Sequence, residues 1–79
     1  MIPGGWSVTT HSQQRRKEMG FTERQIGDVL NAPLMDLPST QHPTRRLSFS
    51  ETIVVVYEPS TKMVVTVLWR SDQVFIMRG

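Results

Sequence analysis

Two apolar segments separated by a short polar connection constrain the fold more than any other part of this sequence. The segments are 53–57 (IVVVY) and 63–69 (MVVTVLW), and the connection, 58–62, contains Pro59. Valine and isoleucine branch at Cβ, which favours strands over helices. Proline cannot donate a hydrogen bond within a sheet, so it fits the connection. The pattern predicts a β-hairpin covered on both faces, because neither segment alternates between apolar and polar residues.

Residues 10–19 (THSQQRRKEM) are predicted to form a surface helix. Thr9, Thr10 or Ser12 can cap its start, and Gly20 can end it. Met19 is its one clear apolar residue, so this helix has little to bury against a sheet.

A second helix is predicted from Thr22 to Asn31. Thr22 and Gln25 have the spacing of a capping box, and Pro33 follows the helix. One face is apolar, with residues three and four positions apart: Ile26, Val29 and Leu30. We expect this face to cover one side of the hairpin.

The remaining segments complete a single α+β domain over residues 1–79. Residues 1–8 are expected to be a loosely ordered arm, because Gly4 and Gly5 oppose regular structure. Residues 32–44 contain three prolines and are expected to be an irregular connection. Residues 45–50 alternate and predict a half-exposed strand, Ser71-Asp72 a turn, and 73–77 a last strand. The predicted fold is a helical part, 9–31, with two helices packed on a three- to four-stranded antiparallel β-meander, 45–78.

Composition excludes several kinds of site. The 79 residues include no cysteine, and the two histidines lack zinc-ligand spacing, so we expect no disulfide, metal or other cofactor. No apolar segment approaches the roughly 20 residues that span a membrane, and the N-terminus does not resemble a signal peptide. We therefore expect a cytoplasmic protein without membrane contact. The net charge is +2, with basic clusters at 15–17 and 45–46.

The order of several short motifs resembles a known group of proteins. The motifs are His11 with Arg15 one turn later, Met19-Gly20-Phe21-Thr22, the apolar face of the second helix, Arg46 on a strand, and Val64-Val65-Thr66-Val67. They resemble small domains of unknown function related to the RelE, ParE and BrnT toxins, within the barnase–EndoU–colicin–RelE group of ribonuclease folds. The size and composition are also similar to accessory proteins of actinobacterial phages. The resemblance implies a RelE- or barnase-like fold and a toxin-type endoribonuclease.

A metal-independent ribonuclease needs a base, an acid and cations around one phosphate, and histidine and arginine suit these tasks. We expect His11 as acid or base, Arg15 and Arg46 as phosphate clamps, and Thr66 as an orienting hydroxyl facing the basic helix. Further substrate contacts are expected from the side chains of four other residues: Arg16, Arg45, Arg70 and Tyr57. Such an enzyme would cleave RNA and leave a cyclic phosphate.

A non-catalytic module of the same fold is the alternative function. It would bind a host protein or an antitoxin-like partner, using the apolar strands at exposed sheet edges. Met19 stands where a basic residue is usual in the family, and the last strand lacks an evident catalytic tyrosine or histidine. The sequence leaves a homodimer open as well.

Overall fold

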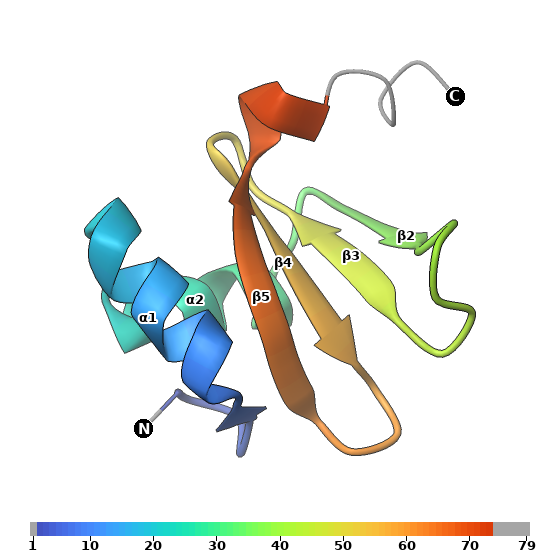
Figure 1. Ribbon diagram of the computed structural model, residues 1–79, viewed down its shortest axis with the longest axis horizontal. Coiled ribbons are helices and arrows are strands. Elements are labelled where there is room, and N and C mark those ends of the chain that lie inside the picture. Colours follow the sequence, from blue (N-terminus) through green and yellow to red (C-terminus); the bar gives the residue numbers. More distant parts are fainter. Residues whose placement is uncertain (1, 74–79) are drawn as a thin grey trace.

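The predicted hairpin forms the centre of the sheet. A computed structural model of the chain describes residues 2–73, with β4 at Ile53–Glu58 and β5 at Met63–Trp69. These strands pair antiparallel, as predicted, and lie in a sheet of order β1-β5-β4-β3-β2 (Figure 1). A register shift between Val56 and Tyr57 leaves Val65 without a partner on β4.

Two further strands extend the sheet on the β4 side. β3 (Arg46–Phe49) pairs antiparallel with β4, which confirms a strand in this region, although Leu47, Ser48 and Phe49 are buried rather than half-exposed. β2 (Met35–Pro38) pairs antiparallel with β3, inside the segment expected to be irregular. Prolines exclude a helix there, but an edge strand tolerates the missing N–H of Pro38.

The N-terminal segment is part of the fold rather than a loose arm. β1 (Ser7–Val8) pairs parallel with β5, so the described sheet is mixed and five-stranded, not a three- to four-stranded antiparallel meander. Gly4 and Gly5 have φ angles of 98° and 77°, which turn the chain so that Ile2 bridges Trp6. Ile2 is only 2% exposed. The glycines therefore shape a turn where the sequence predicted a loosely ordered arm.

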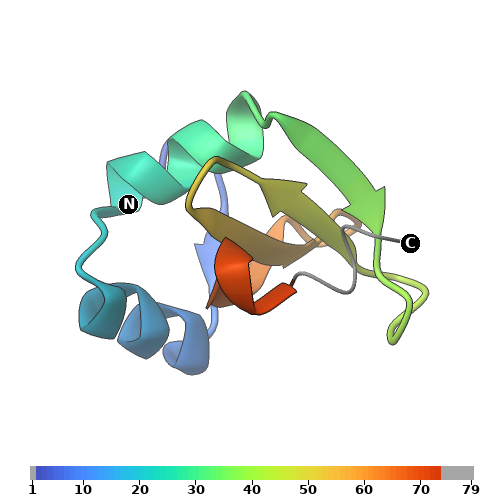
Figure 2. The ribbon, with the colours of Figure 1, turned by 90° about the horizontal axis from the view of Figure 1, so that it is seen from above.

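Both helices form where the sequence predicts them. α1 (Thr10–Met19) is capped by Thr9 and ends at Gly20, whose φ is 81°. α2 (Glu23–Asn31) has the complete capping box of Thr22 and Gln25. Figure 2 shows both helices on the same side of the sheet.

The sheet has two apolar faces. We call the side packed against α2 the helix face; its core combines Ile26, Val29 and Leu30 with Ile53, Val55 and Val67. The opposite face is built on Leu47, Phe49, Val54 and Val56. After β5 the chain forms a 3₁₀ helix, Arg70–Gln73, in place of the predicted turn. The strand predicted at 73–77 falls, from residue 74 onward, outside the described residues.

Candidate functional site

Within residues 2–73, neither edge of the sheet presents a strand whose backbone groups are all available to pair with another chain. Along β5, Thr9 donates from its N–H to the carbonyl of Val64 (3.2 Å) and from its hydroxyl to that of Val65 (3.0 Å). Arg15 Nε donates to the carbonyl of Val67 at 3.4 Å. At the other edge, β2 contains Pro38, which has no N–H to offer. The exposed apolar edges expected for partner binding are thus covered on one side and weakened on the other.

The four predicted catalytic side chains do not share one surface: His11 and Arg15 lie on α1, whereas Arg46 and Thr66 lie on the sheet. His11 is exposed in the first turn of α1 and has no side-chain hydrogen bond or ion pair within residues 2–73. Arg15, on the same helix, lies 3.8 Å from Glu18 and reaches β5. Arg46 is on β3, two strands from β5, and pairs with Asp36 at 2.7 Å. Thr66 is on the face opposite the helices, so these residues do not surround one phosphate.

Thr66 does not face the basic helix, which corrects the sequence prediction. It lies opposite Val56 on β4, and Val56 belongs to the face opposite the helices. The bulge at Val65 explains the difference, because one extra residue reverses the faces of the side chains that follow it. Among the described residues, the buried Thr66 hydroxyl has no hydrogen-bond partner.

Three arginines expected to contact substrate instead bind carbonyl or carboxylate groups of the domain itself. Arg16 Nη1 donates to the carbonyl of Phe21 at 2.7 Å and fixes the turn between the helices. Arg70 Nη1 donates to the carbonyl of Ser50 at 2.7 Å. Arg45 Nε lies 3.9 Å from a carboxylate oxygen of Glu58. Their guanidinium groups are therefore already engaged by partners within the chain.

Tyr57 joins Asp36 and Arg46 in a network on the helix-facing side of β2, β3 and β4. Its hydroxyl donates to one oxygen of Asp36, and Arg46 Nε donates to the other at 2.7 Å. Burial, followed by the hydrogen bond to Asp36 and its charge, raises the pKa of Tyr57 to about 12. The same carboxylate raises the pKa of Arg46 through its hydrogen bond. Tyr57 therefore keeps its proton to a higher pH than an ordinary tyrosine, and it donates this proton in a hydrogen bond to Asp36.

The face opposite the helices carries a pocket of about 280 Å³ beside the β2–β3 loop. Its floor is aliphatic, with Leu47, Val56 and Leu68, and Thr66 and Arg45 also line it. These two are the predicted site residues that the structure brings to one pocket. The pocket offers no large exposed apolar side chain, and its arginine is paired with Glu58.

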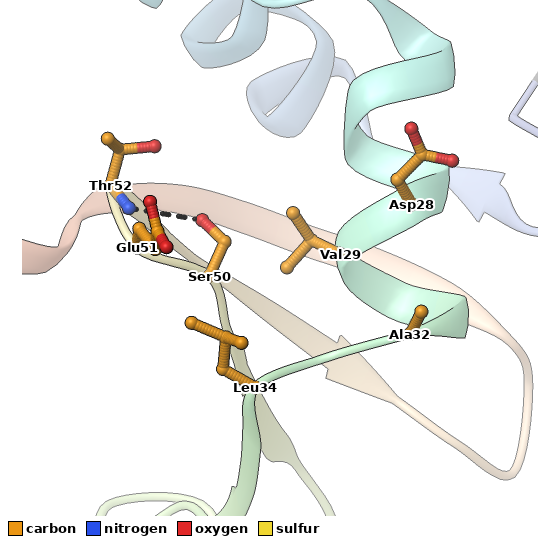
Figure 3. A pocket seen from close by; sticks show the side chains of 7 residues that line it. All are labelled: Asp28, Val29, Ala32, Leu34, Ser50, Glu51 and Thr52. Carbon is orange, nitrogen blue, oxygen red and sulfur yellow. Dashed lines mark hydrogen bonds between the residues drawn. The ribbon is translucent and has the colours of Figure 1, made fainter.

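A second pocket, of about 390 Å³, lies between the end of α2 and the β3–β4 turn (Figure 3). We call it the Leu34 pocket; it is lined by Asp28, Val29, Ala32, Leu34, Ser50, Glu51 and Thr52. Val29 projects from α2 toward Ser50 and Leu34, while Asp28 lies on the helix side and Glu51 on the turn side.

Local structure holds both walls of the Leu34 pocket. The Ser50 hydroxyl accepts from the N–H groups of Thr52 (3.2 Å) and Ile53 (3.0 Å), which fixes the turn. Leu34 N–H donates to the carbonyl of Phe49 at 2.9 Å, which anchors the chain after α2. Leu34 nevertheless remains 66% exposed. Sequence reasoning missed this pocket because 32–44 was expected to be irregular; the leucine directly after Pro33 was the available signal.

Comparison with models of known protein families, with curated proteins and with solved structures found no match. Within residues 2–73, no helix is long and apolar enough to cross a membrane, and no group of three or more metal-ligating side chains is assembled.

Proposed function

We propose that this domain is a non-catalytic interaction module that binds a partner protein at the Leu34 pocket. The observation that supports it best is the 66% exposure of Leu34 beside a pocket with an apolar floor. Binding sites commonly combine a concave surface with apolar lining that a partner can cover. Leu34 stabilises little in the isolated domain, because most of its surface remains in water.

The dispersion of the predicted catalytic residues favours this function over RNA cleavage. A general base and acid must lie within hydrogen-bond reach of the reacting atoms, with cations around the same phosphate. Here His11 lies on α1, Arg46 pairs with Asp36 on the β2 side, and Thr66 lies on the opposite face. Within residues 2–73, these three residues do not lie on a single surface where they could contact one phosphate.

Charge at the Leu34 pocket also favours a protein over a nucleic acid. Asp28 and Glu51 lie on opposite sides of the pocket, and neither has a hydrogen-bond or ion-pair partner within residues 2–73. Carboxylates repel the phosphate backbone, whose binding depends on lysine and arginine. We therefore expect a peptide segment rather than RNA at this surface.

The first test is incubation of the purified domain with total RNA in EDTA, beside His11→Ala and Arg46→Ala. We expect no cleavage above a buffer control from any of the three proteins. Cleavage by the wild type that His11→Ala abolishes would overturn the proposal and support a ribonuclease.

The second test selects linear peptides from a display library on the immobilised domain and measures the binding of the enriched sequences by fluorescence polarisation. Leu34→Ser should weaken binding, whereas Leu34→Met, which keeps an apolar side chain, should retain it. Both variants should fold, because substitutions at exposed positions rarely change stability by more than about 0.5 kcal/mol. Equal binding by wild type and Leu34→Ser would count against the pocket.

A further inference from the structure

We infer that the Leu34 pocket recognises a basic side chain, lysine or arginine, next to an apolar residue of the partner. This inference rests on the proposed function and adds the chemical class of the ligand. The aliphatic stem would lie on Val29 and Leu34, and the cationic head would lie between Asp28 and Glu51. Each part of the ligand thus has a matching part of the pocket.

The electrostatics of the pocket favour a cation. Asp28 and Glu51 are exposed and unpaired within residues 2–73. The pocket also receives the C-terminal end of α2, since Ala32, its C-cap residue, is part of the lining. The partial negative charge at a helix C-terminus attracts cations. Three sources of negative charge therefore line one pocket of a chain whose net charge is +2.

Arg70, which follows β5 and donates to the β3–β4 turn, does not pair with the carboxylates of the pocket. Arg70 donates to the carbonyl of Ser50 at 2.7 Å, but its guanidinium lies 5.8 Å from the centre of the Phe49 ring. Phe49 belongs to the face opposite the helices, whereas Val29 of the pocket belongs to the helix face. Arg70 forms no ion pair with Glu51. A ligand cation would thus find both carboxylates available.

The apolar part of the pocket suits the stem of such a side chain. Lysine and arginine carry three or four methylene groups that lie along apolar surface while the charged head stays in water. Val29, on α2, and Leu34, beside Ser50, both line the pocket and can contact this stem (Figure 3). An acidic side chain would meet two carboxylates there, and a purely apolar one would leave both without a partner.

The test uses defined peptides rather than an unknown partner. One short peptide carries lysine between valine and leucine; matched peptides replace the lysine with arginine, with norleucine, which keeps the stem and lacks the charge, or with glutamate. Binding is followed by NMR of the ¹⁵N-labelled domain. We expect the lysine and arginine peptides to shift the amide signals of 28–32, 34 and 50–52, and the other two peptides to shift them less.

Charge-neutral variants of the domain provide the second arm. Asp28→Asn/Glu51→Gln should weaken the lysine peptide by about 3- to 10-fold, as expected for two partly exposed ion pairs. The matched control, Glu18→Gln/Asp72→Asn, makes the same charge change outside the pocket and should bind normally. Higher salt should reduce the difference between the lysine and norleucine peptides.

Two results would overturn the inference. The first is equal binding of the norleucine and lysine peptides at the pocket, which would retain the interaction module and remove its charge selectivity. The second is the absence of shifts at 28–32, 34 and 50–52 up to millimolar lysine peptide. In the second case, display-selected peptides that still require Leu34 would retain the proposed function, and the absence of any such peptide would remove it too.

Discussion

Asp36, Arg46 and Tyr57 form a hydrogen-bonded network in which both oxygens of one carboxylate are used. Sequence reasoning assigned Arg46 and Tyr57 to substrate, since both are chemically suited to phosphate or base contacts. It did not include Asp36, which became their partner only when the proline-rich segment paired with β3. At the scale of single residues, therefore, the same side chains hold the sheet together and are not free for a substrate.

The network predicts a loss of stability at high pH. The pKa of Tyr57 is raised from 10.0 to about 12, so below pH 10 both folded and unfolded chains keep the proton. Between these values the unfolded chain releases it while the folded chain retains it, so the free energy of unfolding falls as pH rises. Urea midpoints measured across this range should fall less for Tyr57→Phe. Parallel loss in the two proteins would contradict the assignment.

Removing the buried hydroxyl of Thr66 should make the domain more stable. Its hydroxyl is buried and has no hydrogen-bond partner within residues 2–73, and a buried unsatisfied group costs about 1–3 kcal/mol. Thr66→Val keeps the shape without the hydroxyl and should raise the free energy of unfolding by about 1 kcal/mol. Thr66→Ser keeps the hydroxyl and loses the methyl group, so it should be less stable than wild type. Urea denaturation compares the three, and destabilisation by valine would show that the hydroxyl has a partner in solution.

At the scale of elements, α1 and α2 contact the sheet in different ways. α2 buries Ile26, Val29 and Leu30 against the sheet, as its apolar face predicts. α1 is too polar to cover a face and instead lies along the β5 edge, where Arg15 donates to a strand carbonyl. The hydrophobic periodicity of the sequence predicts that α2 packs against the sheet. It does not predict the position of α1, which depends on hydrogen bonds to backbone carbonyls of β5.

The prediction at the scale of elements concerns Gly27, which lies inside α2. Alanine usually stabilises a helix interior by about 1 kcal/mol relative to glycine. At Gly27, however, a Cβ would lie 2.8 Å from Cδ of Pro3 and 3.3 Å from Cγ2 of Ile2. Gly27→Ala should therefore lower the thermal midpoint by displacing the N-terminal segment. Adding Pro3→Ala removes the closest atom and should recover part of the loss; a Gly27→Ala protein more stable than wild type would contradict this contact.

At the scale of the whole molecule, strand pairing between segments distant in sequence determines the parts of the fold that local sequence patterns do not predict. The hairpin, both helices and their caps were predicted because each depends on residues close in sequence. β1 and β2 were missed, since the first pairs parallel with a strand more than fifty residues later and the second lies in a segment with prolines. Ile2 was missed for the same reason: it is buried in a core shared with the distant helix α2, and its Cγ2 would lie 3.3 Å from a Cβ at Gly27.

The sequence by itself determined the secondary structure around residues 9–31 and 46–69, because capping, glycine and β-branched patterns act locally. Only the tertiary structure decided which side chains share a surface. One bulged residue in β5 turned Thr66 to the face opposite α2, and the strand order separated Arg46 from α1. The tertiary structure also places Leu34 beside the β3–β4 turn and so forms a pocket that no local sequence motif predicts. The physical reason is that faces and neighbours depend on register between distant strands, and a single extra residue reverses them.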